Sequence, residues 1–156
     1  MRTEILAPEL GPVVQEIFGS GADPMDDVER RARRALADRR PIVWEGDATT
    51  FQFSYVSPAA EDVLGYPRRR WTGEPTFWGD IVVHPEDRDD AIAYCALATG
   101  KCQDHDFVYR AVAADGRVVW LHDIVKVIPG AKGIPERLRG IMIDITTEVE
   151  GRQSAP

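Results

Sequence analysis

The chain has 156 residues, of which 44% are apolar and 29% charged, an ordinary composition for one globular domain with an appendage. Its net charge is −7, and its basic cluster at residues 30–40 is interleaved with acidic residues, which argues against nucleic acid as a partner. No apolar stretch approaches the ~20 residues that cross a bilayer, and no secretory signal is visible, so we expect a cytoplasmic protein without a membrane partner.

The two cysteines, Cys95 and Cys102, do not form a CxxC pair. In a cytosolic protein we expect two reduced thiols. Cys102 lies near His105, but no second ligand pair follows, so the sequence predicts no metal site.

Residues 1–40 are predicted to be helical, with a first short helix that ends at residues 19–21. A second helix is expected to begin at Asp23 as N-cap, with Pro24 at its first position. Its apolar residues recur at helical spacing, and Val28, Ala32 and Leu36 need burial against the same domain or a second copy. We therefore interpret residues 1–40 as a helical cap or dimerisation extension.

After residue 41 the pattern predicts two strands, short helices, and then three strands. Strands are expected at residues 42–44, 51–56, 106–112, 118–128 and 138–145, and clear helices at 58–64 and 85–99. Ser57 is the expected N-cap of the first of these helices, and Gly65 ends it. Residues 149–156 are expected to be a flexible tail or the start of a signalling helix.

Local motifs in this order resemble the PAS family, which implies an α+β fold with a five-stranded antiparallel sheet over residues 41–148. The motifs are residues 55–66, His84–Arg88, Tyr109-Arg110, Asp115-Gly116 with Trp120, and Asp144–Thr146. Each motif can also be explained by local structure without any chemical role. For example, the proline and acidic residues of His84–Arg88 suit the first turn of a helix.

The resemblance implies a sensory or regulatory module of a bacterial signal-transduction protein, working as a homodimer. It implies a point of signal transmission at Asp144 and Thr146, ahead of an output domain such as a histidine kinase or a cyclase. No nucleophile elbow, phosphate-binding glycine loop or metal box is present, so we expect no enzymatic activity in this chain. A ligand-free interaction scaffold is the alternative function.

Strand alternation, matched to the PAS pattern, assigns one face of the late strands to a central cavity. The residues expected to line or close that cavity are Leu64, Trp78, Ile81, Tyr94, Cys95, Phe107, Tyr109, Leu121, Asp123, Val125 and Met142. The opposite, outer face is expected to be apolar and covered by the N-terminal helices or a second chain. Its candidate residues are Val28, Ala32, Leu36, Trp120, Ile124, Ile141 and Ile143.

Two interpretations of the cavity stay open. Either it is a filled core in which Asp123 bonds to Tyr109 or the backbone, or it holds a small apolar or aromatic ligand anchored by both residues. Haem is disfavoured because residues 85–99 contain no histidine, although Cys95 or His105 could substitute. Flavin is disfavoured because the three late strands contain no Asn or Gln to bond its ring.

Overall fold

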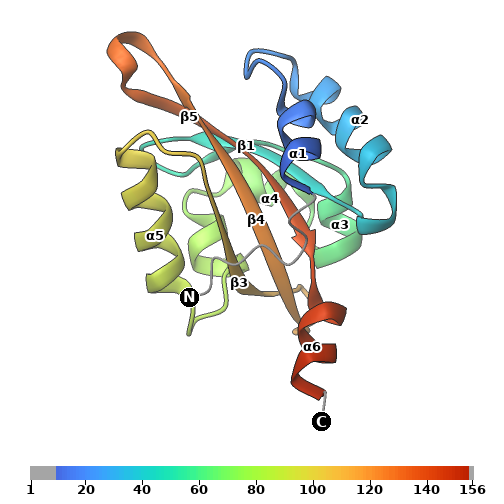
Figure 1. Ribbon diagram of the computed structural model, residues 1–156. Helices are drawn as coiled ribbons and strands as arrows, with labels where there is room; N and C mark the ends of the chain where they lie inside the picture. Colours follow the sequence, from blue (N-terminus) through green and yellow to red (C-terminus); the bar gives the residue numbers. More distant parts are fainter. Residues whose placement is uncertain (1–9, 155–156) are drawn as a thin grey trace.

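In the computed structural model, which describes residues 10–154, one antiparallel sheet separates two groups of helices (Figure 1). The strand order is β2-β1-β5-β4-β3, so the last strand lies at the centre. The strands are β1 Ile42–Asp47, β2 Phe53–Val56, β3 His105–Val112, β4 Val118–Pro129 and β5 Pro135–Asp144. The predicted α+β architecture with five antiparallel strands is confirmed.

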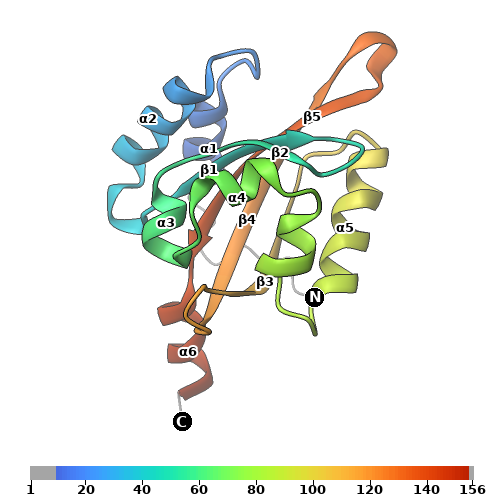
Figure 2. The same cartoon turned by 180° about the vertical axis from the view of Figure 1, so that it is seen from behind.

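One face of the sheet carries α1 (Leu10–Phe18) and α2 (Met25–Ala35), and the other carries the helices between β2 and β3 (Figures 1 and 2). These helices are α3 Ala59–Leu64, α4 Arg68–Gly73, a π-helical turn Trp78–Val82, and α5 Arg88–Gly100. Helix α6, Thr146–Ser154, follows β5 and extends away from the sheet. The segment 149–154 is therefore helical.

The inner face of the sheet, toward α3–α5, carries an aromatic core. Phe107 and Tyr109 of β3, Leu121 and Val125 of β4, and Met142 of β5 are all buried there. The outer face carries a second apolar cluster, in which Val28, Ala32 and Leu36 pack with Ile141 and Ile143 and, at half-buried positions, with Trp120 and Ile124. The strand alternation thus divides the two faces as the sequence pattern predicts.

Two predicted helix caps are wrong. Asp23 does not cap α2; its carboxylate accepts a hydrogen bond from Arg31 at 2.8 Å, and Pro24 occupies the N-cap position. Ser57 does not cap α3, because its hydroxyl accepts the backbone N–H of Val43 at 2.9 Å. The side chain that local capping would use is taken in one place by an arginine further along the same helix and in the other by the backbone of β1.

Gly65 ends α3 with φ +84, as predicted for a left-handed C-cap. The turn between β1 and β2 lies later in the chain than predicted, because β1 continues to Asp47 and β2 begins at Phe53 rather than at residue 51. Phe51 lies in this turn with φ +59, an unusual backbone conformation for a bulky residue.

Candidate functional site

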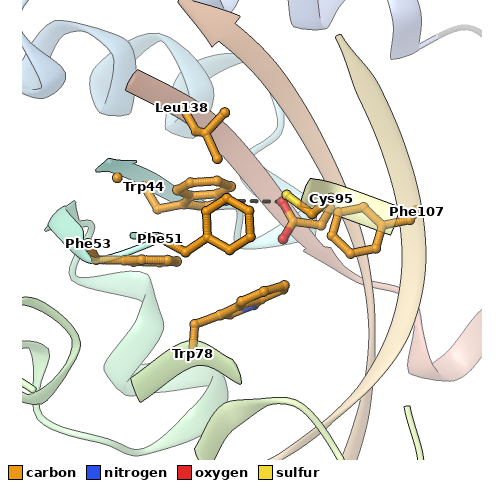
Figure 3. A pocket seen from close by; sticks show the side chains of 9 residues that line it. Trp44, Phe51, Phe53, Trp78, Cys95, Phe107 and Leu138 are labelled. Atoms are coloured by element: carbon orange, nitrogen blue, oxygen red, sulfur yellow. Dashed lines mark hydrogen bonds between the residues drawn. The ribbon is translucent and has the colours of Figure 1, made fainter. Parts of the chain in front are cut away.

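A chain of hydrogen bonds runs through the inner core and ends on one carboxyl group. The indole N–H of Trp78 donates to the Tyr109 hydroxyl at 3.0 Å, and that hydroxyl donates to Asp123 Oδ2 at 2.7 Å. From the other side, the indole N–H of Trp44 donates to Asp123 Oδ1 at 3.0 Å (Figure 3). Asp123 is 1% exposed, so this polar chain is enclosed in apolar surroundings. The Asp123–Tyr109 contact of the filled-core interpretation is present.

The position of Trp44 depends on Gly140. Trp44 of β1 pairs with Gly140 of β5, and Asp123 lies one strand further, on β4. A Cβ atom on Gly140 would lie 2.2 Å from the Trp44 indole, so a side chain there is incompatible with the ring. The absence of that side chain lets the indole cross β5 and reach Asp123.

Burial raises the pKa of Asp123 to about 7, against the lowering effect of its hydrogen bonds from Tyr109 and Trp44. Both donors are neutral, so no positive charge in direct hydrogen-bond contact offsets the burial. Burial, with the nearby Asp123 carboxylate, also raises the pKa of the Tyr109 hydroxyl well above its ordinary value. Tyr109 therefore remains a donor, and Asp123 is the group that titrates near neutral pH.

Cys95 of α5 lies beside this network. Burial and the neighbouring Asp123 raise the pKa of its thiol to about 12. The sulfur lies 3.4 Å from His105 Nε2 and 3.9 Å from the Thr99 hydroxyl. A thiol held in its neutral form is a poor nucleophile and a poor metal ligand.

A small cavity remains between these side chains (Figure 3). Its free space is about 10 Å³, room for one water molecule. The lining residues are Trp44, Gly46, Phe51, Phe53, Trp78, Cys95, Phe107, Asp123 and Leu138. Aromatic rings thus make up much of the lining of this cavity, and rings also contact one another beside it, as in the edge-to-face contact of Trp78 with Tyr109, whose centroids are 5.7 Å apart.

The structure buries most of the predicted cavity residues in the inner core, with Tyr94 half-buried against it. Ile81 is an exception: it is 39% exposed and does not line the cavity. The π-helical turn directs Trp78 and Val82 inward, which leaves Ile81 on the opposite side. Trp44, Phe51 and Phe53 line the cavity and were missed, because β1, β2 and their connecting turn were not assigned to it.

The cofactors weighed from the sequence do not fit this core. A flavin ring would need far more than the space of one water, and none of the cavity-lining side chains is an amide. For haem, α5 carries no histidine, and His105 Nε2 is directed at the Cys95 sulfur. Within residues 10–154, no group of three or more His, Cys, Asp or Glu side chains is placed to hold a metal ion.

The end of the sheet forms a second region of interest, where β5 passes into α6. The Asp144 carboxylate accepts the N–H and the hydroxyl of Thr146 at 2.9 and 2.6 Å. The Thr146 hydroxyl oxygen in turn accepts the backbone N–H of Trp120 at 2.9 Å. The start of α6 is therefore attached to β4 on the outer side of the sheet.

Comparison with known proteins identifies the fold. A family described as PAS fold matches residues 53–142, more than half of the chain. The chain belongs to the PAS family. A search of curated proteins returns no match.

Solved structures include similar PAS domains. The N-terminal domain of a diguanylate cyclase with PAS/PAC sensor from Marinobacter aquaeolei is 34% identical, with a TM-score of 0.64, over 70% of this chain and 98% of that one. A sensory box histidine kinase/response regulator from Burkholderia thailandensis E264 is 20% identical, with a TM-score of 0.64, over 80% and 91%. A LOV domain of the blue-light activated histidine kinase of Erythrobacter litoralis EL346 is 20% identical, with a TM-score of 0.54, over 67% and 94%. The last two similarities concern the fold alone.

Among residues 10–154, no helix has both the length and the apolar character that spanning a bilayer requires.

Proposed function

We propose that this PAS domain is a sensory or regulatory module that passes a conformational signal to an output domain through α6. The similar domain from a diguanylate cyclase supports a cyclase as output, and a histidine kinase is the other output class that we consider, in the same polypeptide or in a partner. Any catalysis would then lie outside this domain.

The observation that carries the proposal is the attachment of α6 both to the sheet and to the N-terminal helical region. Thr146 joins the helix to β4, as described above. Two residues later, Glu148 forms an ion pair with Arg39, which follows α2. Val149 also packs on the outer apolar cluster together with the N-terminal helices. A displacement of either the sheet or the N-terminal cap therefore changes contacts of α6.

We further propose that the domain works as a homodimer. Val108, Trp120 and Ile124 lie on the outer sheet face and stay half-buried although α1 and α2 pack on the same cluster. A second copy would complete their burial. The domain boundaries at residues 41 and 148, with a cap before them and a signalling helix after them, belong to this proposal.

A ligand-free interaction scaffold is the second candidate, and the small volume of the inner cavity favours it. In that case the input is a contact with the N-terminal cap, and the aromatic core is purely structural. The pathway through Arg39 and Thr146 to α6 is the same in both candidates.

Hydrogen exchange of α6 tests the transmission. Arg39→Gln removes the ion pair with Glu148, and we expect the α6 amides to exchange roughly two- to fivefold faster, the effect of a partly exposed ion pair. Arg34→Gln, at an exposed position of α2, is the matched control and should leave α6 unchanged. Unchanged α6 exchange in Arg39→Gln, measured by mass spectrometry, would contradict coupling between cap and output helix.

Light scattering of wild type and Trp120→Glu tests the dimer, which the substitution should dissociate.

A further inference from the structure

The hydrogen bonds at Asp123 have a fixed direction. An indole N–H donates and does not accept, so the Tyr109 oxygen accepts from Trp78 and the Tyr109 hydrogen is directed to Asp123 Oδ2. The indole of Trp44 likewise makes Oδ1 an acceptor. Both carboxyl oxygens therefore accept, which is the pattern of an ionised carboxylate. Protonation of Asp123 adds a hydrogen, and one hydrogen is then left without an acceptor among these four side chains.

The surroundings of Asp123 favour the neutral acid instead. Asp123 is 1% exposed, and two titratable groups face it, the Tyr109 hydroxyl of β3 and the Cys95 thiol of α5. Burial raises the pKa of both groups, so neither carries a charge at neutral pH. The side chains that β1, β5 and the π-helical turn place in this part of the core do not ionise: Trp44, Met142 and Trp78.

The next titratable group lies on the other face of the sheet. His122 precedes Asp123 and is directed outward, where its Nε2 atom lies 2.8 Å from Asp106. Among the described residues, no cationic side chain hydrogen-bonds to Asp123. Burial thus favours the protonated acid and the hydrogen bonds favour the carboxylate, so the two forms are close in free energy. The pKa of about 7 agrees with this balance.

The inner cavity determines where the added hydrogen lies. Oδ2 accepts the shorter bond, at 2.7 Å from Tyr109, whereas Oδ1 accepts from Trp44 at 3.0 Å. Trp44 lines the cavity together with Asp123 and Cys95 (Figure 3). A hydrogen on Oδ1 therefore points into this cavity, where one water molecule has room to accept it. A neutral oxygen is a weaker acceptor than a carboxylate, so the bond from Trp44 weakens on protonation.

We propose that the proton is the input signal of this domain, that Asp123 is the sensing group, and that the hydrogen bond from Trp44 is the contact that changes with its ionisation. This inference deepens the proposed sensory function by naming its signal, and rests on that function for transmission to α6. As the pH rises, the Oδ1–H bond breaks and the proton passes to solvent water, with no other covalent change. The carboxylate then binds the indole of Trp44 more strongly.

Trp44 is connected to both regions that contact α6. The adjacent residue Val43 packs in the outer cluster with α2 and Val149. The strand partner of Trp44 is Gly140 on β5, the strand that ends two residues before α6. A change in the Trp44 contact therefore has a route to α6 through the N-terminal helices and another through β5.

A pH titration followed by NMR between about pH 5 and pH 9 tests the proposal. The signals are the Asp123 ¹³Cγ, the assigned Trp44 indole N–H and the α6 amides. We expect all three to change with one common midpoint near pH 7, where the Asp123 carboxyl titrates. Asp123→Asn should abolish the change at Trp44 and in α6, because the amide does not ionise.

Tyr109→Phe removes a donor that stabilises the ionised form, so it should raise the midpoint by about one pH unit. Tyr94→Phe, the same change on α5, is the matched control and should leave the midpoint unchanged. Imidazole groups titrate in the same pH range. Each histidine is therefore replaced by glutamine in turn, and the Trp44 titration should persist in all three variants: His84→Gln, His105→Gln and His122→Gln.

An Asp123 midpoint below pH 5, or a Trp44 signal that stays constant while Asp123 ionises, would overturn the proposal. If Asp123→Asn does not fold, an unchanged midpoint in Tyr109→Phe overturns it equally. Amides of α6 that respond to Arg39→Gln but not to pH would show that α6 transmits and that the proton is not its input. If Trp44 titrates with Asp123 and α6 responds to neither change, sensing in the core stands and the proposed transmission through α6 fails.

Discussion

The indole ring of Trp44 occupies the space above Gly140, where a Cβ atom would lie 2.2 Å from its Cε2 and Nε1 atoms. The two residues are paired across β1 and β5. Because the glycine leaves the surface of β5 open, the indole extends over that strand and donates to Asp123 on β4. A residue of β1 is thus hydrogen-bonded to a residue of β4 across β5, inside the core.

Gly140→Ala should therefore destabilise the domain by about 2 kcal/mol or more, because the methyl group displaces Trp44 and removes a donor from a buried carboxyl. Gly73→Ala is the matched control, since a Cβ atom there meets nothing within 4 Å. Urea unfolding followed by tryptophan fluorescence measures both. Equal stability of Gly140→Ala and wild type would contradict the position of the Trp44 ring.

The raised pKa of Asp123, about 7, predicts a specific dependence of stability on pH. In the unfolded chain the carboxyl ionises near pH 4, whereas in the folded domain it keeps its proton until about pH 7. Its contribution is therefore fully present below pH ~4, declines as the pH rises and reaches its minimum above pH ~7. The total loss is roughly 4 kcal/mol, at about 1.4 kcal/mol per pKa unit.

Asp123→Asn lacks this titration, so the stability of wild type relative to the variant should fall between pH 5 and pH 8. The variant has its own cost, because the amide cannot accept from both Trp44 and Tyr109, but that cost does not vary with pH. The measurement is urea unfolding of both proteins at several pH values, with exposed Asp80→Asn as control. A difference between wild type and Asp123→Asn that stays constant over this range would contradict the raised pKa.

The two cysteines should differ in reactivity. Burial and the nearby Asp123 raise the pKa of the Cys95 thiol to about 12, whereas Cys102 is half-buried and reaches solvent. Iodoacetamide at pH 8 should label native protein at Cys102 alone. Peptide mass spectrometry locates the label, and Cys102→Ser should remain unlabelled until denaturant is added. Rapid labelling of native Cys95 would contradict its placement beside the core network.

Asp87 and Arg110 form a partly buried ion pair that fixes the turn before α5 to β3. The Asp87 carboxylate accepts the backbone N–H of Arg110 at 2.8 Å and its guanidinium at 2.7 and 3.0 Å. The hydrogen bonds from Arg110 lower the pKa of Asp87, so its stabilisation is present above pH ~4 and is lost as the pH falls through the lowered value.

Asp87→Asn should therefore cost about 1–3 kcal/mol at pH 7, and the cost should decline as the pH is lowered below ~4, measured by urea unfolding. Glu86→Gln is the matched control: Glu86 contacts the same guanidinium at 3.1 Å, but its side chain is 72% exposed. A solvated pair of this kind contributes at most ~1 kcal/mol. Similar losses for both substitutions would indicate that burial of Asp87 does not matter.

Period-two alternation was sufficient to separate the two faces of the late strands from sequence, because each side chain of a strand points opposite to its neighbours. Asp123 was placed inside for this reason, and Trp120 and Ile141 outside. Local patterns failed where backbone geometry is irregular. Ile81 lies within a π-helical turn that no spacing rule predicted, and Phe51 adopts a left-handed conformation instead of beginning β2.

The partners of Asp123 show what the sequence alone determines and what only the tertiary structure decides. The sequence determines that an acid on the inner face of β4 needs donors, and Tyr109 was a predicted one since β3 and β4 form a hairpin. Trp44 lies 79 residues before Asp123 and on a strand that does not pair with β4. Only the insertion of β5 between β1 and β4, with a glycine where the indole must cross, brings the two together. Packing across these three strands depends on the space that Gly140 leaves because it has no side chain. No local sequence pattern predicts that space.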